Sequence, residues 1–143
     1  MRLGSAEARA RFTAAPVARL ATADVSGVPH LVPVTFAVTG DTVYFAVDHK
    51  PKRTRDLRRL RNIAQNPRVA LLADHYADDW TTLWWARADG RATVRTGPEH
   101  CRTPLALLAE KYPQYRDHPP EGPVVAVEVT GWSGWAVAGP ATS

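Results

Sequence analysis

The sequence has very little cysteine and no long apolar run. Cys101 is the single cysteine in 143 residues, which excludes an internal disulfide and a cysteine-rich zinc cluster. The longest aliphatic run is Val69–Ala73, far shorter than the roughly 20 residues that a membrane span needs. Residues 1–12 contain no apolar stretch typical of a signal peptide. We therefore expect a soluble, cytoplasmic protein without a membrane span.

Motifs that hold phosphates or carry nucleophilic catalysis are also missing. There is no G-x-G-x-x-G or G-x-x-x-x-G-K-[ST] motif, and no serine lies in a G-x-S-x-G context. We expect no metal site, because four candidate ligands match no known ligand spacing: Asp74, His75, Asp78 and Asp79. We interpret His30 as a satisfied, half-buried histidine. Without an evident acid, base or nucleophile, catalysis would draw its reactivity from a bound cofactor.

What the sequence does contain is a strongly basic segment after its third apolar run. Residues 50–61 carry seven positive charges against one negative charge at Asp56. The cations are Lys50, Lys52, Arg53, Arg55, Arg58, Arg59 and Arg61. The whole chain is only +4, so removing the +6 of this segment leaves −2 for the remainder. A local excess of this kind usually serves to bind a particular anion.

Patterning before the basic segment predicts one helix and three strands. Residues 5–15 favour a helix with Ser5 as its N-cap. Three extended runs follow, at residues 17–22, 29–38 and 42–47, and Ser26-Gly27 forms a turn between the first two. Pro33 cannot donate a hydrogen bond to a neighbouring strand, so it marks an edge or an irregular point of its strand.

The basic segment itself is expected to end in a helix. From residue 55 to residue 65 the apolar period becomes helical, with Thr54 as a suitable N-cap. Asn66-Pro67 ends the helix, because a residue before proline avoids the α region. The apolar side is expected to hold Leu57, Leu60 and Ala64, roughly opposite Arg55, Arg58 and Arg59.

The second half of the sequence predicts further strands and one more helix. Residues 68–74 are apolar on both faces, which indicates a central strand. Residues 81–96 form a long strand or hairpin, with a turn or bulge at Asp89-Gly90. A helix starts at Thr103-Pro104 and ends near Pro113, and residues 124–130 form the last strand. The whole predicts a mainly β fold, an antiparallel six-stranded barrel with a few short helices, as a single domain over residues 1–143.

Three tryptophans raise separate expectations. Trp84 and Trp85 are neighbours on a predicted strand, so one belongs to the core and the other faces a groove or a partner chain. Trp80 lies in the polar segment "HYADDW", where a large solvent-exposed aromatic is hard to justify. Packing between two chains and a wall of a ligand pocket are both open interpretations of these residues.

Several stretches together resemble a known family. "ARLATADVSGVPHLVPVTFAVTGDTVYFAVDHKPK", "LRRLRNIAQNPRVALL", "DHYADDW" and "LWWARADG" are similar to the split-β-barrel flavin-binding superfamily of pyridoxamine 5′-phosphate oxidases. The closer resemblance is to its branch that depends on the deazaflavin coenzyme F420. It covers roughly residues 10–135, nearly the whole chain.

The resemblance implies a homodimer with two cofactor sites in grooves between the subunits. The ring would lie along the strand that contains Val32, Pro33, Val34 and Thr35. The phosphate would be held by basic residues after the third strand, here Lys50, Lys52, Arg53, Thr54, Arg58 and Arg59. Arg58-Arg59 stands where the oxidases carry an Arg-Lys pair, and the "HKPKRTRD" connection is longer than theirs.

The basic segment has three interpretations. A solvated arginine face is the simplest, and nucleic-acid binding is disfavoured because the remaining charge is net negative and no nucleic-acid module is present. A phosphorylated cofactor is the third. Flavin mononucleotide needs only two or three cations around one phosphate. Coenzyme F420 carries a phosphodiester and a chain of glutamates, so a row of cations suits it better.

These observations lead to a functional hypothesis. The chain is expected to be a homodimeric oxidoreductase that uses reduced F420 to deliver a hydride to an electron-poor double bond in a small organic substrate. Trp80 and Trp85 would shape the substrate side, and the sequence names no catalytic acid or base. The alternatives are an FMN-dependent oxidase and a protein that binds F420, flavin or haem without turnover.

Overall fold

The computed structural model describes residues 1–47, 57–120 and 122–137. The described part contains eight strands: β1 (Arg2–Leu3), β2 (Ala18–Ala23), β3 (Pro29–Val34), β4 (Ala37–Thr39), β5 (Thr42–Ala46), β6 (Arg68–His75), β7 (Trp84–Arg95) and β8 (Val124–Ala136). Its helices are α1 (Ser5–Ala14), α2 (Arg58–Gln65), α3 (Pro98–Lys111) and α4 (Gln114–Asp117), with the 3-10 turn η1 (Trp80–Thr82). No helix among these residues is long and apolar enough to cross a membrane.

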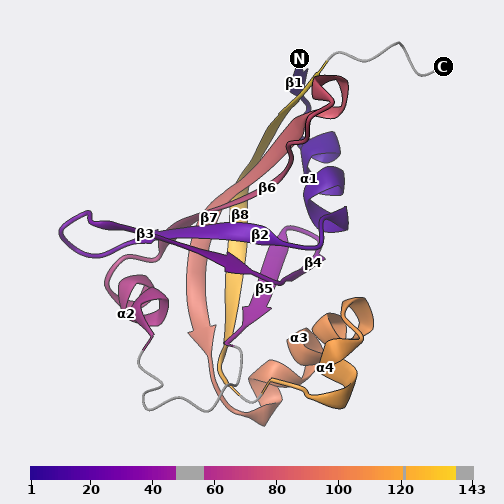
Figure 1. Ribbon diagram of the computed structural model, residues 1–143. Helices are drawn as coiled ribbons and strands as arrows, with labels where there is room; N and C mark the ends of the chain where they lie inside the picture. Colours follow the sequence, from indigo (N-terminus) through magenta and orange to yellow (C-terminus); the bar gives the residue numbers. More distant parts are fainter. Residues whose placement is uncertain (48–56, 121, 138–143) are drawn as a thin grey trace.

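The strands form one antiparallel sheet in the order β3-β2-β6-β7-β8-β5-β4, and β1 pairs with β8. Its two ends, β3 and β4, follow one another in the chain and are separated only by Thr35 and Phe36. We call this two-residue connection the β3–β4 junction. A sheet whose edges are this close in sequence must curl upon itself, and Figure 1 shows β2 and β3 crossing the long strands β6 to β8. The expected split β-barrel, mainly antiparallel with a few helices, is confirmed.

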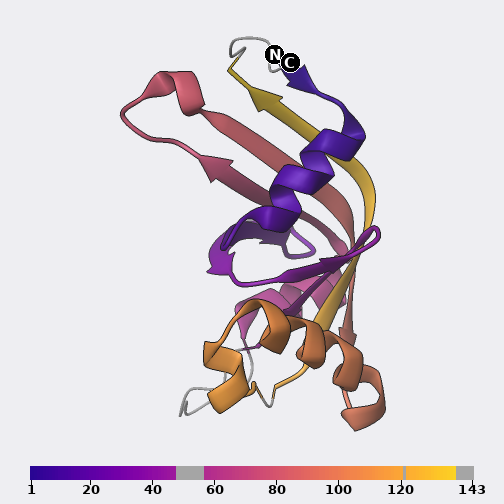
Figure 2. The same ribbon diagram turned by 90° about the vertical axis from the view of Figure 1, so that its right-hand side faces the viewer.

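The interior of the curled sheet is filled by large apolar side chains. Phe12 from α1 is fully buried and contacts Phe36, with ring centroids 4.7 Å apart, and Trp132 of β8, with centroids 5.4 Å apart. Leu20 and Leu71 belong to the same core. Figure 2 shows α1 lying across the long strands, which is how Phe12 enters this core. A smaller cluster joins α3 to the sheet at its other end, through Cys101 and Leu108.

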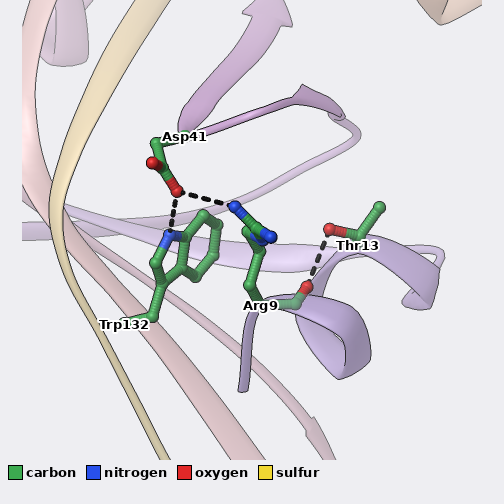
Figure 3. A network of polar contacts seen from close by, with 4 residues as sticks. All are labelled: Arg9, Thr13, Asp41 and Trp132. Carbon is green, nitrogen blue, oxygen red and sulfur yellow. Dashed lines mark hydrogen bonds and ion pairs between the residues drawn. The ribbon is translucent and has the colours of Figure 1, made fainter. Parts of the chain in front are cut away.

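A polar network closes the surface beside this core. The Oδ1 atom of Asp41, in the β4–β5 turn, accepts hydrogen bonds from Trp132 Nε1 at 2.9 Å and Arg9 Nη1 at 3.1 Å (Figure 3). The Thr13 hydroxyl donates to the carbonyl oxygen of Arg9 at 2.7 Å. The bonds from Trp132 and Arg9 lower the pKa of Asp41. The network therefore ties α1, the β4–β5 turn and β8 together.

A bulge interrupts the pairing of β7 with β8. Asp89 pairs with Gly131 and Gly90 pairs with Val129, so Thr130 is the extra residue. The Thr130 hydroxyl donates to the Asp89 carbonyl oxygen at 3.2 Å. Of the two possibilities at Asp89-Gly90, the structure shows the bulge. Because one residue is inserted, the inward positions of β8 change from Val125 and Val127 to Trp132.

Three expectations about helix ends are wrong. Gly4 is the N-cap of α1, and Ser5 is its first residue. α2 begins at Arg58 with Leu57 as N-cap, so Thr54 does not cap it. α3 begins at Pro98 after Gly97, so Pro104 lies inside the helix. Each helix therefore starts at another residue than the one with the most favourable capping side chain. Tertiary packing, or a proline at the first helical position, decides where a helix starts.

The buried face of α2 also differs from the expected one. Asn62 and Ile63 are its buried residues, whereas Ala64 is exposed. The amide of Asn62 donates to the buried Thr22 hydroxyl at 3.0 Å, and Gln65 Oε1 accepts from the backbone N–H of Val25 at 3.1 Å. α2 is therefore anchored on the β2–β3 hairpin by polar contacts, which a count of apolar residues does not reveal.

Candidate functional site

The outward face of β2, β3, β6 and β7 carries a groove of about 620 Å³. Its floor consists of small or aliphatic side chains, Ala21, Ala70 and Leu72, and Leu31 and Trp85 stand on either side. Ala21 and Ala70 are direct cross-strand partners. Because alanine adds little height to the sheet, the floor is flat. A groove of this volume falls within the range of small-molecule sites.

The charges at the groove rim are already paired. Arg19 lies 3.7 Å from Asp74, and Arg87 Nε donates to Asp89 at 2.9 Å. The Arg87 guanidinium also lies 5.9 Å from the Trp85 ring centroid. Paired ions leave little net charge at the rim, so the groove suits a flat, weakly charged ring better than a polyanion.

The cationic part of the candidate site lies on α2. Arg58 is exposed, whereas Arg59 is half-buried, and burial lowers the pKa of Arg59. Among the described residues Arg59 has no hydrogen-bond or ion-pair partner. A partly desolvated guanidinium that has no counter-ion among the described residues is costly for that part of the protein alone. It is also well suited to bind an anion, because the desolvation cost has already been met.

An unpartnered nitrogen lies near α2. His30 pairs across the strands with Thr22, the residue that binds Asn62 of α2. The Nδ1 atom of His30 is buried and has no hydrogen-bond partner within the described ranges. The interpretation of His30 as a satisfied histidine is therefore wrong for this atom. Arg59 and His30 thus offer two polar groups that the described protein leaves without partners.

The β3 residues predicted to line a ring divide between two faces. Val34 is buried in the core and Val32 packs against it, so their side chains face the interior. Pro33 points outward and is exposed, and Thr35 is half-buried at the β3–β4 junction. Of β3, Leu31 lines the groove; Pro33 and Thr35 continue its outward row beyond the groove lining, and Val32 and Val34 present only their backbone on that side. Pro33 lies on an edge strand of the described sheet, as expected.

The tryptophans also separate. Trp84 packs against the core, and Trp85 lines the groove, which confirms that the neighbours face opposite ways. Trp80 is 75% exposed in η1, beyond the end of β6. α2 precedes the other end of β6, whose eight residues span about 25 Å. Figure 1 likewise shows α2 well below the connection from β6 to β7 at the top of the view, so one chain does not bring Trp80 and Arg59 together.

Four predicted site residues lie outside the described residues: Lys50, Lys52, Arg53 and Thr54. Sequence reasoning missed the groove rim, Arg19 and Arg87, although strict alternation along the strands places Arg19 on the same face as Ala21. It also missed Tyr112 and Tyr115, which reach the β3–β4 junction from α3 and α4. No pattern in the sequence shows that these helices pack there.

Both tyrosines bind the junction through their hydroxyls. Tyr112 Oη accepts from the Phe36 N–H at 3.1 Å and lies 2.8 Å from the Pro16 carbonyl oxygen and 3.0 Å from that of Phe36. Tyr115 Oη lies 2.7 Å from Thr35 Oγ1. The two rings contact each other edge to face, with centroids 5.7 Å apart. The junction is therefore fixed from the side of α3 and α4.

Lys111 completes this contact. Its ammonium donates to the carbonyl oxygens of Ala15 at 2.8 Å and Thr13 at 3.3 Å, and it lies 3.7 Å from the Phe36 ring centroid. Burial lowers the pKa of Lys111 from 10.5 to about 8. The folded chain therefore releases this proton at a lower pH than the unfolded chain.

This difference predicts a pH dependence of stability. Since the unfolded chain binds more protons between pH 8 and 10.5, Lys111 adds to the free energy of unfolding as the pH rises through this window. We expect the wild type to gain stability relative to Lys111→Met over that range, modestly because the side chain is half-exposed. Urea denaturation of both proteins at a series of pH values measures the difference. Parallel stability curves would contradict the shift.

The chain belongs to the pyridoxamine 5′-phosphate oxidase family, whose model matches residues 5–136. None of the curated proteins matches it. Solved structures show the same fold. A conserved hypothetical protein of Mycobacterium tuberculosis has a TM-score of 0.77 and 20% identity, with 99% of this chain and 91% of that chain covered. An FAD-binding protein of Mesorhizobium loti has a TM-score of 0.72 and 20% identity, with 94% and 95% covered.

A haem storage protein of Vibrio cholerae has a TM-score of 0.67 and 19% identity, with 92% of this chain and 94% of that chain covered. Proteins of this fold thus include ones described as binding FAD and one described as storing haem. Because these identities are low, the structural likeness concerns the fold alone, and the ligand must be argued from the residues of this chain.

Proposed function

We propose that this chain is an oxidoreductase that binds the deazaflavin coenzyme F420 and transfers a hydride to an electron-poor double bond of a small organic substrate. The observation that carries the proposal is Arg59, a half-buried cation without a described partner. It belongs to a segment with seven cations in residues 50–61. Such a row of charge suits the elongated anionic tail of this coenzyme better than a single phosphate.

The β2–β3 hairpin connects the two parts of the proposed site. On one face Thr22 binds α2, and on the other face Ala21 lines the groove. Arg58 and Arg59 would bind the phosphodiester and tail, together with Lys50, Lys52, Arg53 and Thr54 of the preceding segment. The flat floor beside Pro33 and Trp85 would accept the ring, whose polar edge could meet backbone groups of β3. A half-buried cation beside a flat, weakly charged floor is the feature of the described residues that supports this assignment.

The protein's own contribution is position and exclusion of water. A bound reduced deazaflavin supplies the hydride. The groove walls, Leu31 and Trp85, would hold a substrate against the ring in a dry slot, which favours transfer by proximity. The paired rim ions, Arg19 with Asp74 and Arg87 with Asp89, would orient polar parts of the substrate without adding net charge.

The same proposal includes a homodimer. Leu31, Tyr76 and Trp80 are large apolar side chains that one chain leaves mostly exposed. They lie on or beyond the outward face that carries the groove, and a second copy would cover them. Trp80 and Arg59 lie at opposite ends of β6, so only a two-chain arrangement could make them part of one site.

Fluorescence titration tests the cofactor assignment. Oxidised F420 and flavin mononucleotide are titrated in parallel into the purified protein, whose mass in solution is measured by light scattering. We expect F420 to bind more tightly, one per chain, to a particle of two chains. Oxidation of the reduced cofactor with a panel of enones and quinones then tests turnover. Tighter binding of flavin mononucleotide with oxygen consumption would favour an oxidase, and F420 binding without turnover would favour a carrier.

A further inference from the structure

The β3–β4 junction links the two edge strands of the curled sheet, which is not closed by pairing between them. Thr35 and Phe36 join its two edge strands, and Phe36 is fully buried against Phe12. The contacts from Lys111, Tyr112 and Tyr115 all converge on this junction or on the end of α1 beside it. Cys101 and Leu108 hold α3 against the sheet, so these side chains extend from a packed helix and not from a free loop.

Thr35 continues the outward side of β3 at this junction, beyond Leu31, which lines the groove. Along β3 the side chains of Leu31 and Pro33 point outward, and those of Val32 and Val34 point inward. Thr35 continues the outward row, whereas Phe36 returns to the core. The hydroxyl bound by Tyr115 therefore belongs to the row that begins at the groove wall.

The hydrogen bonds of the two tyrosines do different work. Tyr112 Oη accepts from the Phe36 N–H, so its own proton must go to a carbonyl oxygen of Phe36 or Pro16. It thereby fixes the backbone. Tyr115 Oη contacts only the Thr35 side chain among the hydrogen bonds of the described residues. If Tyr115 donates to Thr35, the Thr35 proton is free to donate to a third group.

We propose that Tyr112 and Tyr115 are positioning residues of the cofactor site: Tyr112 fixes the backbone of the β3–β4 junction, and Tyr115 orients the Thr35 hydroxyl so that it donates to the bound ring. This inference rests on the proposed function. It gives α3 and α4, which contribute nothing to the groove lining, a role in the site. It also explains why the hydroxyl of the half-buried Tyr115 forms a hydrogen bond with a threonine at the sheet edge.

A double-mutant cycle on cofactor affinity tests the role of Tyr115. The Kd for oxidised F420 is measured for wild type, Tyr115→Phe, Thr35→Val and the double variant. We expect each single variant to weaken binding about three- to tenfold. Because Tyr115 acts through Thr35, adding Tyr115→Phe to Thr35→Val should have no further effect. Both single variants should also shift the absorption maximum of the bound ring in the same direction. Thr35→Ser keeps the hydroxyl, so its absorption maximum should be that of the wild type.

Equal weakening by Tyr115→Phe in both backgrounds would show a general structural effect and overturn this role, as would an unchanged Kd in Tyr115→Phe. A wild type that binds no F420 would instead overturn the proposed function, and with it the donation from Thr35 to the ring. These two failures are read from different proteins in the same experiment, so they cannot be confused.

Amide hydrogen exchange tests the role of Tyr112 without any cofactor. In the cofactor-free protein, Tyr112→Phe removes the acceptor of the Phe36 N–H, and we expect this amide to exchange at least about tenfold faster. Tyr115→Phe is the matched control, because it removes a neighbouring hydroxyl that does not bind the Phe36 amide. Exchange at Phe36 that is unchanged in Tyr112→Phe, or equally faster in both variants, would overturn the role of Tyr112.

Discussion

Replacing Arg58 and Arg59 together by alanine is expected to weaken F420 binding about a hundredfold or more and to leave the cofactor-free chain at least as stable as the wild type. A charge-assisted hydrogen bond contributes about 1.5–3 kcal/mol, and about 1.4 kcal/mol corresponds to a tenfold change in Kd. Arg59 dominates the expectation, because it is half-buried and desolvated already. Isothermal calorimetry with oxidised F420 measures the change in affinity.

The stability of the cofactor-free protein provides a second, independent test of this prediction. Arg59 has no described partner that would be lost, and its removal relieves a desolvation cost, so Arg59→Gln should keep or raise the midpoint of thermal unfolding. A residue that only held the fold together would lower affinity and stability at once.

Removal of two other positive charges, outside α2, provides the control. Arg68 and Arg91 are exposed, are direct cross-strand partners, and lie where β6 begins, close to the end of α2. The double variant Arg68→Ala with Arg91→Ala therefore tests the general field of the protein without touching α2. We expect it to weaken binding only a few-fold, and less in higher salt. Equal losses in the two double variants would contradict a specific contact at Arg58 and Arg59.

The strands could be predicted from the sequence, because one side of most of them faces the core. Residues 68–74 are apolar on both faces and do lie between two neighbours, β2 and β7. Pro33 predicts an edge or an irregular point, and β3 is an edge strand. The split of Trp84 and Trp85 between core and groove follows from alternation alone. Each of these predictions depends only on residues close together in the sequence, and the fold agrees with them.

What could not be predicted depends on contacts between distant segments. The long run 29–38 is in fact two strands, because the chain turns at Thr35 and Phe36 to reach the opposite edge of the sheet. Asn62 is buried because Thr22, forty residues away, accepts its hydrogen bond. Tyr112 and Tyr115 act on the junction from about eighty residues further along the chain, at separations of 76 and 80. No single-segment pattern contains such pairings.

The groove, too, could be predicted from the sequence only in part. Its floor, Ala21 and Ala70, is composed of residues that alternation places on the outer face, but their adjacency requires the β2–β6 register. The side chains of Val32 and Val34 face the core, so of the ring contacts expected for these residues, through backbone groups as much as side chains, only those of the backbone stay open. Alternation along the sequence already places Val32 and Val34 on one face and Leu31, Pro33 and Thr35 on the other. The groove itself, which Leu31 lines, arises only when β2, β3, β6 and β7 lie side by side in the folded sheet.

Gly90→Ala is expected to destabilise the fold by about 1–3 kcal/mol or more, as overpacking at a closely packed point does. A Cβ atom at Gly90 would clash with the carbonyl oxygen of Glu128 and lie 2.9 Å from its carbonyl carbon. Both are backbone atoms of β8, so no side-chain rotation relieves the clash. The two strands would have to separate where the bulge at Thr130 directs Trp132 into the core.

Gly131→Ala is the matched control for this prediction. Gly131 lies on the partner strand one pair away, opposite Asp89, and a Cβ there meets no atom within 4 Å. Both changes add the same methyl group and the same intrinsic preference, so only the contact with Glu128 differs. We expect a loss of roughly 2–4 °C in Tm per kcal/mol for Gly90→Ala and almost none for Gly131→Ala. Equal melting temperatures would show that β7 and β8 can part at the bulge without cost, and the bulge could then not be what fixes the direction of Trp132.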